Sequence, residues 1–363
     1  MVYILAGKTF LIGYATMKIL RALLSLFCLF CGVYTLTAKE VVIVPCDHLS
    51  MNPEHFTYRP GMSNDEMFFW RMVDKELKAN GYEIRISNMS EFDSYENTQR
   101  LLEQVDKVIF NNIPDWTGAG WRDKLSWIGA DKCLLIGWEP PSVLPEMYKP
   151  KMLERFNTVL TWDDSYVDNI KFFKMNYPSM QGMISKFPSF TEKKFATQIS
   201  GNKRSPHNHE LYSERKKVID YFEAHPEAGF EFYGYGWPGE QFTNYRGAPQ
   251  DKTGVLKTYR FNFCYENITN IAGYITEKIF DSFTAACVPI YWGATNISEY
   301  IPSNCYIDRT QFASMRDLVK YLKNMPEDEY NRYIENIQAF LKSEKAQAFT
   351  RRQLADAILK QLL

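Results

Sequence analysis

An acid and a base, Glu277 and Lys278, stand side by side in the stretch YENITNIAGYITEKIF, which runs from Tyr265 to Phe280. The first half is rich in asparagine and glycine, and the second half has the apolar spacing of a helix. A lysine at a helix N-terminus adds its charge to backbone N–H groups that already favour phosphate. A neighbouring carboxylate can accept hydrogen bonds from ribose hydroxyls. The pattern suits a nucleotide site, and it is also typical of a solvated ion pair on a helix surface.

The apolar residues of this predicted helix share one face at i, i+4, i+8 spacing, and they are Ile275, Ile279, Phe283 and Ala286. The residues left off that face are Tyr274, Glu277, Lys278 and Asp281. We expect these four side chains to point toward solvent or into a cleft.

A second acid, Glu139, ends a short apolar run in LLIGWEPP. Trp138 precedes it and two prolines follow, which predicts a stiff turn in apolar surroundings. Such surroundings raise the pKa of a carboxyl group and suit it to accept a proton from a hydroxyl group. An exposed loop glutamate is the alternative.

Segments typical of strands alternate with segments typical of helices along the chain. The predicted strands lie in EVVIVP, YEIRIS, QVDKVIFN, DKCLLIG, FNTVLT, KKFATQIS, GFEFYGYG, RFNFCYEN and VPIYWGA. This alternation predicts an α/β fold with parallel sheets, arranged as two units with a cleft between them. Ligands of such sheets gather where strands end and loops enter helices.

We expect four segments in the chain. Residues 1–38 form a leader, because a positive start at Met17-Lys18 and Arg21 precedes a stretch without charge that ends in small residues. This leader is either a signal peptide or an uncleaved membrane anchor. Residues 39–192 form a first α/β domain, residues 193–325 a second α/β domain, and residues 326–363 C-terminal helices.

Composition excludes several classes of protein. The formal net charge of -1 gives no general attraction to nucleic acid or to an anionic membrane surface. Five widely spaced cysteines outside the leader predict buried free thiols, not a disulfide framework or a zinc site. The pair His207 and His209 is typical of a solvated loop. Asp163-Asp164 is the nearest approach to an Asp-x-Asp metal motif, which the chain lacks, and a capping pair at a helix start explains it equally well.

The segment FNFCYENITNIAGYITEKIFDSFTAACVPIYWGATNISEYIP resembles the donor-site signature of the α1,3/α1,4-fucosyltransferases, glycosyltransferase family 10. It matches that family's aromatic-x-aromatic-x-aromatic-Glu-Asn, Tyr-[Ile/Val]-Thr-Glu-Lys and [Val/Ile]-Pro-[Ile/Val]-x-x-Gly in order and spacing. The likeness is strong over residues 230–302 and thin before residue 131. It implies a GT-B fold of two Rossmann-like domains facing a central cleft, with residues 39–192 as the acceptor-side domain and residues 193–325 as the nucleotide-sugar-binding domain that holds GDP-fucose. It also implies inversion at the anomeric carbon and no metal or cofactor.

Carried over position by position, the resemblance implies that Lys278 binds the diphosphate, Glu277 the ribose and Tyr274 the flank of the nucleotide. Arg215 matches an arginine that also reaches the diphosphate. The other positions that match the donor-site motifs are Ser200, Asn202, Glu266 and Asn267. Glu139 falls where the family places its general base, within a local sequence, GWEPP, that differs from the family's.

We therefore predict an inverting fucosyltransferase of the secretory pathway or cell envelope, in a Golgi-like lumen if the host is eukaryotic. Its expected partners are GDP-fucose and an oligosaccharide or glycan acceptor, with membrane association if the leader stays as an anchor. Two alternatives remain open. One is a GT-B transferase that uses another nucleotide sugar, and the other is a non-catalytic secreted glycan-binding protein on this scaffold.

Overall fold

The computed structural model describes residues 39–44, 68–87, 89–114 and 121–363. The predicted leader and Cys46 lie outside the described residues. From Glu40 on, the described residues belong to one compact unit that contains two parallel sheets. The alternation of strands and helices along the chain confirms the predicted α/β fold.

A six-stranded first sheet has the order β2-β1-β3-β4-β5-β6. Its strands are β1 (Lys39–Val44), β2 (Tyr82–Ile86), β3 (Val105–Asn111), β4 (Cys133–Gly137), β5 (Thr158–Thr161) and β6 (Phe172–Lys174). The pairings that run from β1 through β3, β4 and β5 to β6 are all parallel. Sequence patterns predicted the first five strands, and they missed β6.

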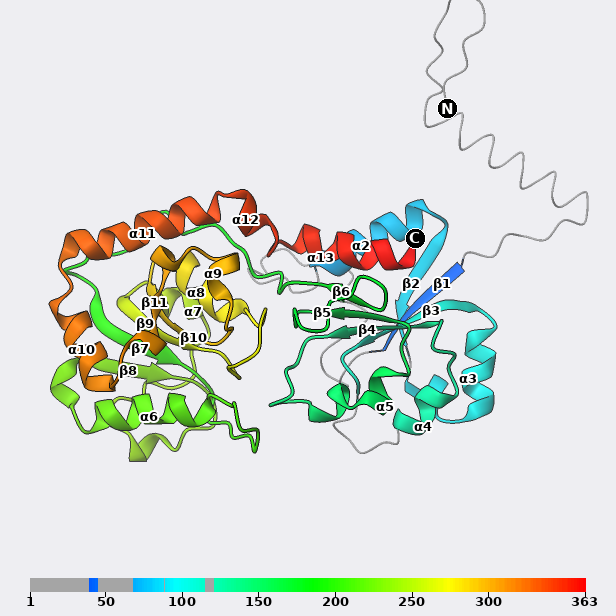
Figure 1. Cartoon of the computed structure of the whole chain (residues 1–363), viewed down its shortest axis with the longest axis horizontal. Coiled ribbons are helices and arrows are strands. Elements are labelled where there is room, and N and C mark those ends of the chain that lie inside the picture. The colour runs from blue at the N-terminus through cyan, green and yellow to red at the C-terminus, as the bar shows by residue number, and fades with distance from the viewer. Residues whose placement is uncertain (1–38, 45–67, 88, 115–120) are drawn as a thin grey trace, which may run out of the picture. The chain divides into compact units, whose positions relative to one another are not determined.

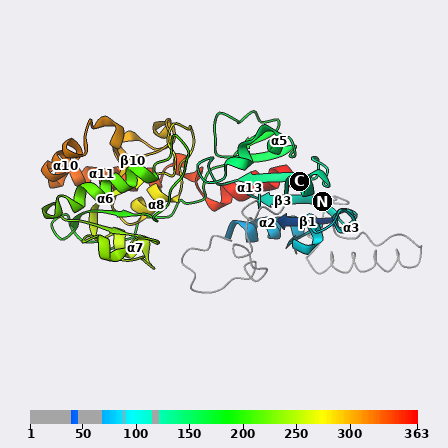
Figure 2. The ribbon, with the colours of Figure 1, turned by 90° about the horizontal axis from the view of Figure 1, so that it is seen from below.

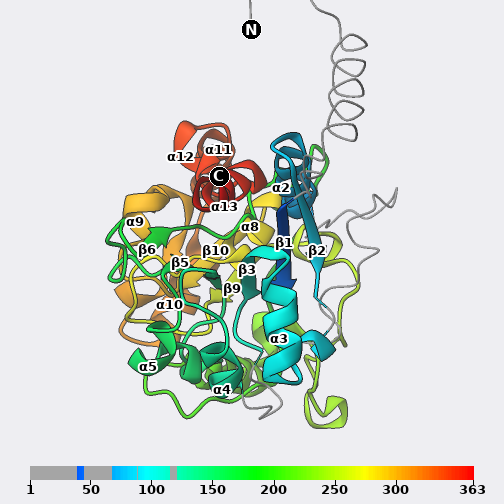
Figure 3. The same cartoon turned by 90° about the vertical axis from the view of Figure 1, so that its right-hand side faces the viewer.

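Helices cover both faces of the first sheet. The helix α2 (Phe68–Ala79) shares one core with the last helix of the chain, α13 (Arg351–Leu362). The other face carries α3 (Tyr95–Leu102), α4 (Trp121–Ser126) and α5 (Pro150–Leu153). Residues of β4 alternate between the two cores, as expected for a strand buried on both sides. Figures 1 and 3 show α2 and α3 on opposite sides of the sheet.

A five-stranded second sheet has the order β11-β10-β9-β7-β8, with parallel pairings throughout. Its strands are β7 (Lys194–Ile199), β8 (Phe230–Tyr233), β9 (Tyr259–Tyr265), β10 (Val288–Trp292) and β11 (Ile307–Asp308). The chain moves from β7 outward to β8 and then returns to β9 on the other side of β7. The strand order therefore reverses between β7 and β9. Loops that leave such a point diverge and open a crevice at the carboxyl ends of the strands.

The second sheet also has helices on both faces. They are α6 (Tyr212–Glu223), α7 (Lys252–Leu256), α8 (Glu277–Thr284), α9 (Ile297–Tyr300), α10 (Met315–Asn324), α11 (Glu327–Leu341) and α12 (Glu344–Gln347). Figure 1 shows α6 on one face of this sheet and α11 on the other. The apolar stripe predicted for α8 is confirmed, because all four of its members are buried in the core.

The C-terminal helices pack against both halves of the structure. Helix α11 packs against β10 of the second sheet, whereas α13 packs against α2 of the first. Figures 1 and 2 show α13 beside α2. The apolar residues of α13 complete the core above β1, β3 and β4. Closure of the first core thus depends on the last residues of the chain.

Other sequence predictions have mixed outcomes in the described residues. The free, buried state predicted for cysteines is confirmed for Cys133, Cys264, Cys287 and Cys305. The helix cap predicted at Asp163-Asp164 is wrong, since these residues form a turn after β5 and no helix begins there. Over the described ranges there is no group of three or more metal-ligating His, Cys, Asp or Glu residues. Within those same ranges, no helix is both long and apolar enough to span a bilayer.

Ile358 tests the packing of α13, because its side chain has no exposed surface and belongs to the core shared with α2. We expect Ile358→Ala to lower the free energy of unfolding by about 3 kcal/mol, through lost burial and a residual cavity. Lys360→Ala on the exposed side of the same helix is the control and should change it by less than about 0.5 kcal/mol. Urea unfolding measures both variants. Equal losses would contradict the packing of α13 on the first sheet.

Candidate nucleotide-binding site

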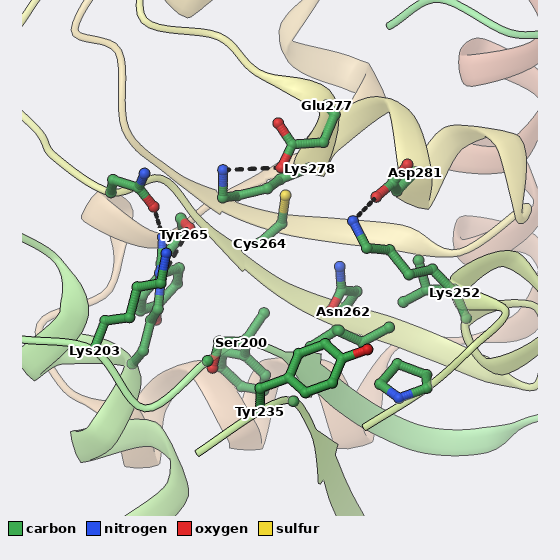
Figure 4. Close-up of a pocket in the computed structure, with 18 of the residues that line it drawn as sticks. Ser200, Lys203, Tyr235, Lys252, Asn262, Cys264, Tyr265, Glu277, Lys278 and Asp281 are labelled. Carbon is green, nitrogen blue, oxygen red and sulfur yellow. Dashed lines mark hydrogen bonds and ion pairs between the residues drawn. The ribbon is translucent and has the colours of Figure 1, made fainter. Parts of the chain in front are cut away.

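A cavity of about 260 Å³ opens where the strand order of the second sheet reverses. Its lining comes from residues 199–201 and Lys203 at the end of β7, from Gly234 and Tyr235 after β8, and from residues 262–265 and Asn267 of β9 and its end. Pro249 and residues of helices α6, α7 and α8 supply the rest of the wall. In the view of Figure 4, Lys203 and Lys252 lie on opposite sides, with Asn262 and Cys264 of β9 between them. The cavity is therefore at the position that the topology predicts for a ligand.

A glycine lets two loops meet at one wall of this cavity. Gly234 has φ +144°, and a Cβ atom there would collide with the backbone carbonyl of Ser200. No residue with a side chain fits this position without moving the loop after β7. The Ser200 carbonyl also accepts a hydrogen bond from Trp237 Nε1 at 2.7 Å. The glycine-rich GYGW turn thus shapes the cavity wall.

The N-terminus of α8 is built on a buried carboxylate. Glu266 is 0% exposed and accepts hydrogen bonds from the backbone N–H of Thr276 at 2.8 Å and from its hydroxyl at 2.7 Å. Thr276 is the N-cap of α8, where its Oγ1 accepts from the backbone N–H of Lys278. Lys278 Nζ lies 3.2 Å from Glu266 Oε2 and 3.2 Å from Glu277 Oε1. Lys278 Nζ also donates to Thr276 Oγ1 at 2.9 Å, so the ammonium contacts three groups.

The charges of Glu277 and Lys278 stabilise each other. Burial works against the Lys278 ammonium, but the carboxylates of Glu266 and Glu277 outweigh it and raise the lysine pKa. Burial also opposes the Glu277 carboxylate, yet Lys278 and Lys252 lower its pKa to about 2. Both residues stay ionised at neutral pH. The adjacent acid and base are thus suited to holding a ligand and not to exchanging a proton.

Arg215 projects from α6 into the same cavity and is 6% exposed. Its Nε and Nη2 donate to the Tyr265 carbonyl at 3.2 and 2.7 Å, and Nη2 also donates to Asn267 Oδ1 at 2.9 Å. Its Cζ lies 4.9 Å from the centre of the Tyr212 ring. In the part of the chain that the structure describes, Nη1 makes no hydrogen bond. The guanidinium is therefore fixed along one edge and keeps a donor for an anion.

Sequence reasoning missed several lining residues, among them Lys203, Lys252 and Tyr235. Lys203 follows the predicted site residues Ser200 and Asn202 after β7. Lys252 is the first residue of α7, and Asp251 caps that helix. Lys252 Nζ lies 3.1 Å from Asp281 Oδ2. Tyr235 has 73% of its side chain exposed and lines the cavity. The available signals were a lysine next to a strand end and an Asp-Lys helix start, each of which is common on surfaces.

The structure brings together five of the predicted site residues, namely Ser200, Arg215, Asn267, Glu277 and Lys278, as lining of one cavity. Glu266 lies behind that lining and supports Lys278. Asn202 is exposed and points elsewhere, because its Nδ2 donates to the Gly236 carbonyl at 3.0 Å. The roles predicted for these residues stay predictions. The geometry supports them for the five lining residues more than for Asn202.

Tyr274 does not point toward solvent or a cleft, so that expectation is wrong. The side chain is 1% exposed, and its ring centre lies 4.5 Å from that of Trp162, which follows β5. Its hydroxyl accepts from Asn267 Nδ2 at 3.3 Å. Helical periodicity misplaced Tyr274 because it precedes α8, in a loop that packs against aromatic residues of the first sheet.

Glu139 sits directly after β4, in the turn that the sequence predicted. Asn112 Oδ1 accepts from the backbone N–H groups of Trp138 at 2.7 Å and of Glu139 at 3.2 Å, and the Tyr148 hydroxyl donates to the Glu139 carbonyl at 2.7 Å. Burial raises the pKa of the Glu139 carboxyl group, and the positive charges of Lys278 and Lys203 partly offset that rise. The carboxyl group therefore lies within electrostatic range of two cations that line the cavity.

Comparison with known proteins identifies the part of the chain that holds this cavity. Residues 193–357 match the family model described as "Glycosyltransferase family 10 (fucosyltransferase) C-term". These residues are therefore similar to the C-terminal domain of glycosyltransferase family 10. The resemblance noted in the sequence is thereby confirmed.

Several curated proteins are similar to parts of this chain. An alpha-(1,4)-fucosyltransferase of Arabidopsis thaliana is 38% identical over 74 residues, which are 20% of this chain and 18% of that protein. The alpha-(1,3)-fucosyltransferase FucT of Helicobacter pylori is 24% identical over 152 residues, 42% of this chain and 28% of that protein. The GDP-fucose protein O-fucosyltransferase 3 of Xenopus laevis is 33% identical over 84 residues, 22% and 18% of the two chains. The matched region thus spans less than a third of each relative.

Solved structures share the fold over nearly the whole of this chain. An alpha1,3-fucosyltransferase with GDP-fucose has a TM-score of 0.52 at 16% identity, covering 91% of this chain and 92% of that one. A DNA-modifying β-glucosyltransferase has a TM-score of 0.53 at 14% identity, covering 88% and 99%. At these identities the likeness is one of fold. It confirms the GT-B architecture of two parallel-sheet domains and leaves the sugar undecided.

Gly234 tests the wall between the loops after β7 and β8. We expect Gly234→Ala to lower the free energy of unfolding by about 2 kcal/mol or more, since the new Cβ meets backbone and not a movable side chain. Gly182→Ala is the matched control, because a Cβ there meets nothing within 4 Å. Chemical denaturation of both variants measures the difference. If the two glycines tolerate alanine equally, the close approach of Gly234 to Ser200 is wrong.

Proposed function

We propose that this chain is an inverting fucosyltransferase that moves fucose from GDP-fucose to a hydroxyl group of a glycan without a metal ion. The observation that carries the proposal is the shared cavity of Arg215 and Lys278 in a family 10 domain. Two cations from different helices, α6 and α8, line one hollow at the ligand-binding edge of the second sheet. A diphosphate is the part of a nucleotide sugar that such a pair recognises.

The cations act on the leaving group. As the bond between fucose C1 and the phosphate oxygen breaks, GDP departs with the electron pair and gains negative charge. Lys278 Nζ and Arg215 Nη1 stabilise that charge more in the transition state than in the ground state, which accelerates transfer. Lys203 and Lys252 add positive charge to the same lining. These side chains supply what a divalent cation supplies in metal-dependent transferases.

Glu139 acts on the acceptor. Its ionised carboxylate takes the proton of the acceptor hydroxyl while that oxygen forms a new bond to fucose C1. Attack from the face opposite the leaving GDP inverts the configuration at C1 in one displacement. Burial raises the pKa of Glu139, which suits a base, and the positive charges of Lys278 and Lys203 partly offset that rise. The Glu139 carboxyl group fits this role, because it makes no hydrogen bond to the residues that the structure describes. Only the backbone of Glu139 is hydrogen-bonded there, to Asn112 and Tyr148.

Two other candidates have weaker support. A GT-B transferase with another nucleotide sugar is compatible with the fold, because one structural neighbour was crystallised with uridine diphosphoglucose. A non-catalytic glycan-binding protein has no use for four cationic side chains around one cavity. We further propose that residues 1–38 direct the enzyme to the secretory pathway or cell envelope. That segment lies outside the described residues.

Calorimetry and turnover assays separate these candidates. We expect purified protein to bind GDP more tightly than UDP, equally well with and without EDTA, and to release GDP from GDP-fucose when a glycan acceptor is added. Lys278→Met should lose at least tenfold in GDP affinity, while the exposed control Lys320→Met keeps it. Glu139→Gln should bind GDP normally and lose about 10²–10⁴-fold in kcat.

Three results would contradict this account in different ways. Stronger binding of UDP would point to another donor. Binding of GDP with no turnover on any glycan or peptide acceptor would favour the non-catalytic alternative. Undiminished turnover by Glu139→Gln would remove that residue as the base.

The pH dependence offers a separate test of Glu139. Because Lys203 lowers the Glu139 pKa, Lys203→Met should raise it, so the base becomes protonated at a higher pH. The acid limb of the kcat/KM profile should then move to higher pH relative to the wild type and to Lys320→Met. An acid limb that stays in place or moves to lower pH would show that another group limits activity.

A further inference from the structure

We propose that Asp164 is a positioning residue for the transfer reaction, which fixes the glycine loop against the first sheet. The glycine loop is the segment of residues 266–276 that ends at the N-cap of α8. This inference rests on the proposed function, because that function makes Lys278 a donor-binding residue. Asp164 itself does not line the cavity and touches no proposed substrate atom.

One carboxylate gathers donors from both sheets. Asp164 Oδ1 accepts from Lys174 Nζ at 2.6 Å and from the Tyr300 hydroxyl at 2.7 Å. Its Oδ2 accepts from Asn296 Nδ2 at 2.8 Å. Lys174 belongs to β6 of the first sheet, whereas Tyr300 ends α9 and Asn296 precedes it in the second. Asp164 therefore joins the turn after β5 to the loop after β10.

The same group of residues holds the backbone of the glycine loop. Asn296 Oδ1 accepts from the backbone N–H of Gly273 at 2.9 Å, while its Nδ2 stays on Asp164. The backbone N–H of Asp164 donates to the Ala272 carbonyl at 3.3 Å. Two consecutive residues of the loop are thus tied to Asp164, one directly and one through Asn296.

Gly273 shows how close this approach is. Its φ of +84° is a conformation that L side chains rarely adopt, and a Cβ there would collide with the Trp162 carbonyl. The same Cβ would lie only 2.8 Å from Asp164 Oδ2 and 2.8 Å from Lys174 Nζ. Lys174 Nζ also donates to the Trp162 carbonyl at 2.7 Å. The loop therefore has one packed arrangement against the turn after β5.

The position of Gly273 determines the position of Thr276, which contacts Lys278. Three residues further on, Thr276 caps α8, and its Oγ1 accepts from Lys278 Nζ at 2.9 Å. Tyr274, between them, packs against Trp162. A displacement at Gly273 is passed along this short backbone to Thr276 and hence to Lys278. Small misplacements of binding groups cost large factors in rate, because the reacting atoms must be aligned.

The charge of Asp164 fits this structural use. Burial opposes its ionised form, but hydrogen bonds from Lys174, Tyr300 and Asn296 outweigh burial and lower its pKa. Both carboxylate oxygens are occupied by donors. This explains TWDDS better than either a helix cap or a metal motif.

Amide hydrogen exchange and steady-state kinetics on four variants test the proposal. Tyr300→Phe removes a single donor, and Asp164→Asn removes the charge. Asp163→Asn is the neighbouring control, since the hydrogen bonds of its carboxylate stay within the turn, to the backbone and hydroxyl of Ser165. We expect at least tenfold loss of kcat in Asp164→Asn, a smaller loss in Tyr300→Phe, and faster exchange over residues 268–276 in both. The double variant, which combines Asp164→Asn with Tyr300→Phe, should lose a smaller factor in kcat than the product of the two separate factors.

A positioning role and a stabilising role predict different readouts. Positioning predicts that kcat falls more than GDP affinity and that loop exchange rises in Tyr300→Phe while its unfolding midpoint stays close to that of the wild type. Loop exchange unchanged in Tyr300→Phe and Asp164→Asn, or a kcat loss no larger than in Asp163→Asn, would overturn the proposal. If wild-type protein shows no fucose transfer at all, the proposed function fails. Loop exchange and GDP affinity still decide the role of Asp164 in that case.

Discussion

A carboxylate with no exposed surface, Glu266, sits at the base of α8 and determines where the cationic side of the cavity lies. A buried charge is costly unless it is paired and fully hydrogen-bonded. Glu266 meets that condition through the backbone and hydroxyl of Thr276 and through Lys278. The arrangement gives up some stability relative to an apolar core and gains a lysine whose position is set by several short contacts. That lysine lines the cavity together with Arg215, Lys203 and Lys252.

The proposed chemistry is divided between the two sheets. The cations proposed to stabilise a leaving nucleotide lie at the strand reversal of the second sheet, and the proposed base follows β4 of the first. Aromatic residues connect them. Trp162 Nε1 and the Tyr177 hydroxyl both donate to the Trp138 carbonyl, next to Glu139, while Trp162 packs on Tyr274. Tyr274, which sequence reasoning placed at the nucleotide, thus connects the α8 loop to the first sheet.

Sequence patterns predicted the elements that bury long apolar runs and missed the short ones. β6 has three residues and β11 has two, so neither shows a period. The motif residues that line the cavity were found because they stand at strand ends and at a helix start. Tyr274 was misplaced because a residue just before a helix does not follow its periodicity. Asp164 was misread because its partners Lys174 and Tyr300 lie 10 and 136 residues away, beyond the reach of local patterns.

The most direct test of the central claim is a crystal structure of the protein with GDP, grown in the presence of EDTA. The account predicts that the base and ribose occupy the cavity at the β7–β9 reversal. It also predicts phosphate oxygens within hydrogen-bonding distance of Arg215 Nη1 and Lys278 Nζ, with Glu266 still on Thr276. A diphosphate bound elsewhere, or one that requires a divalent ion to be ordered, would contradict it.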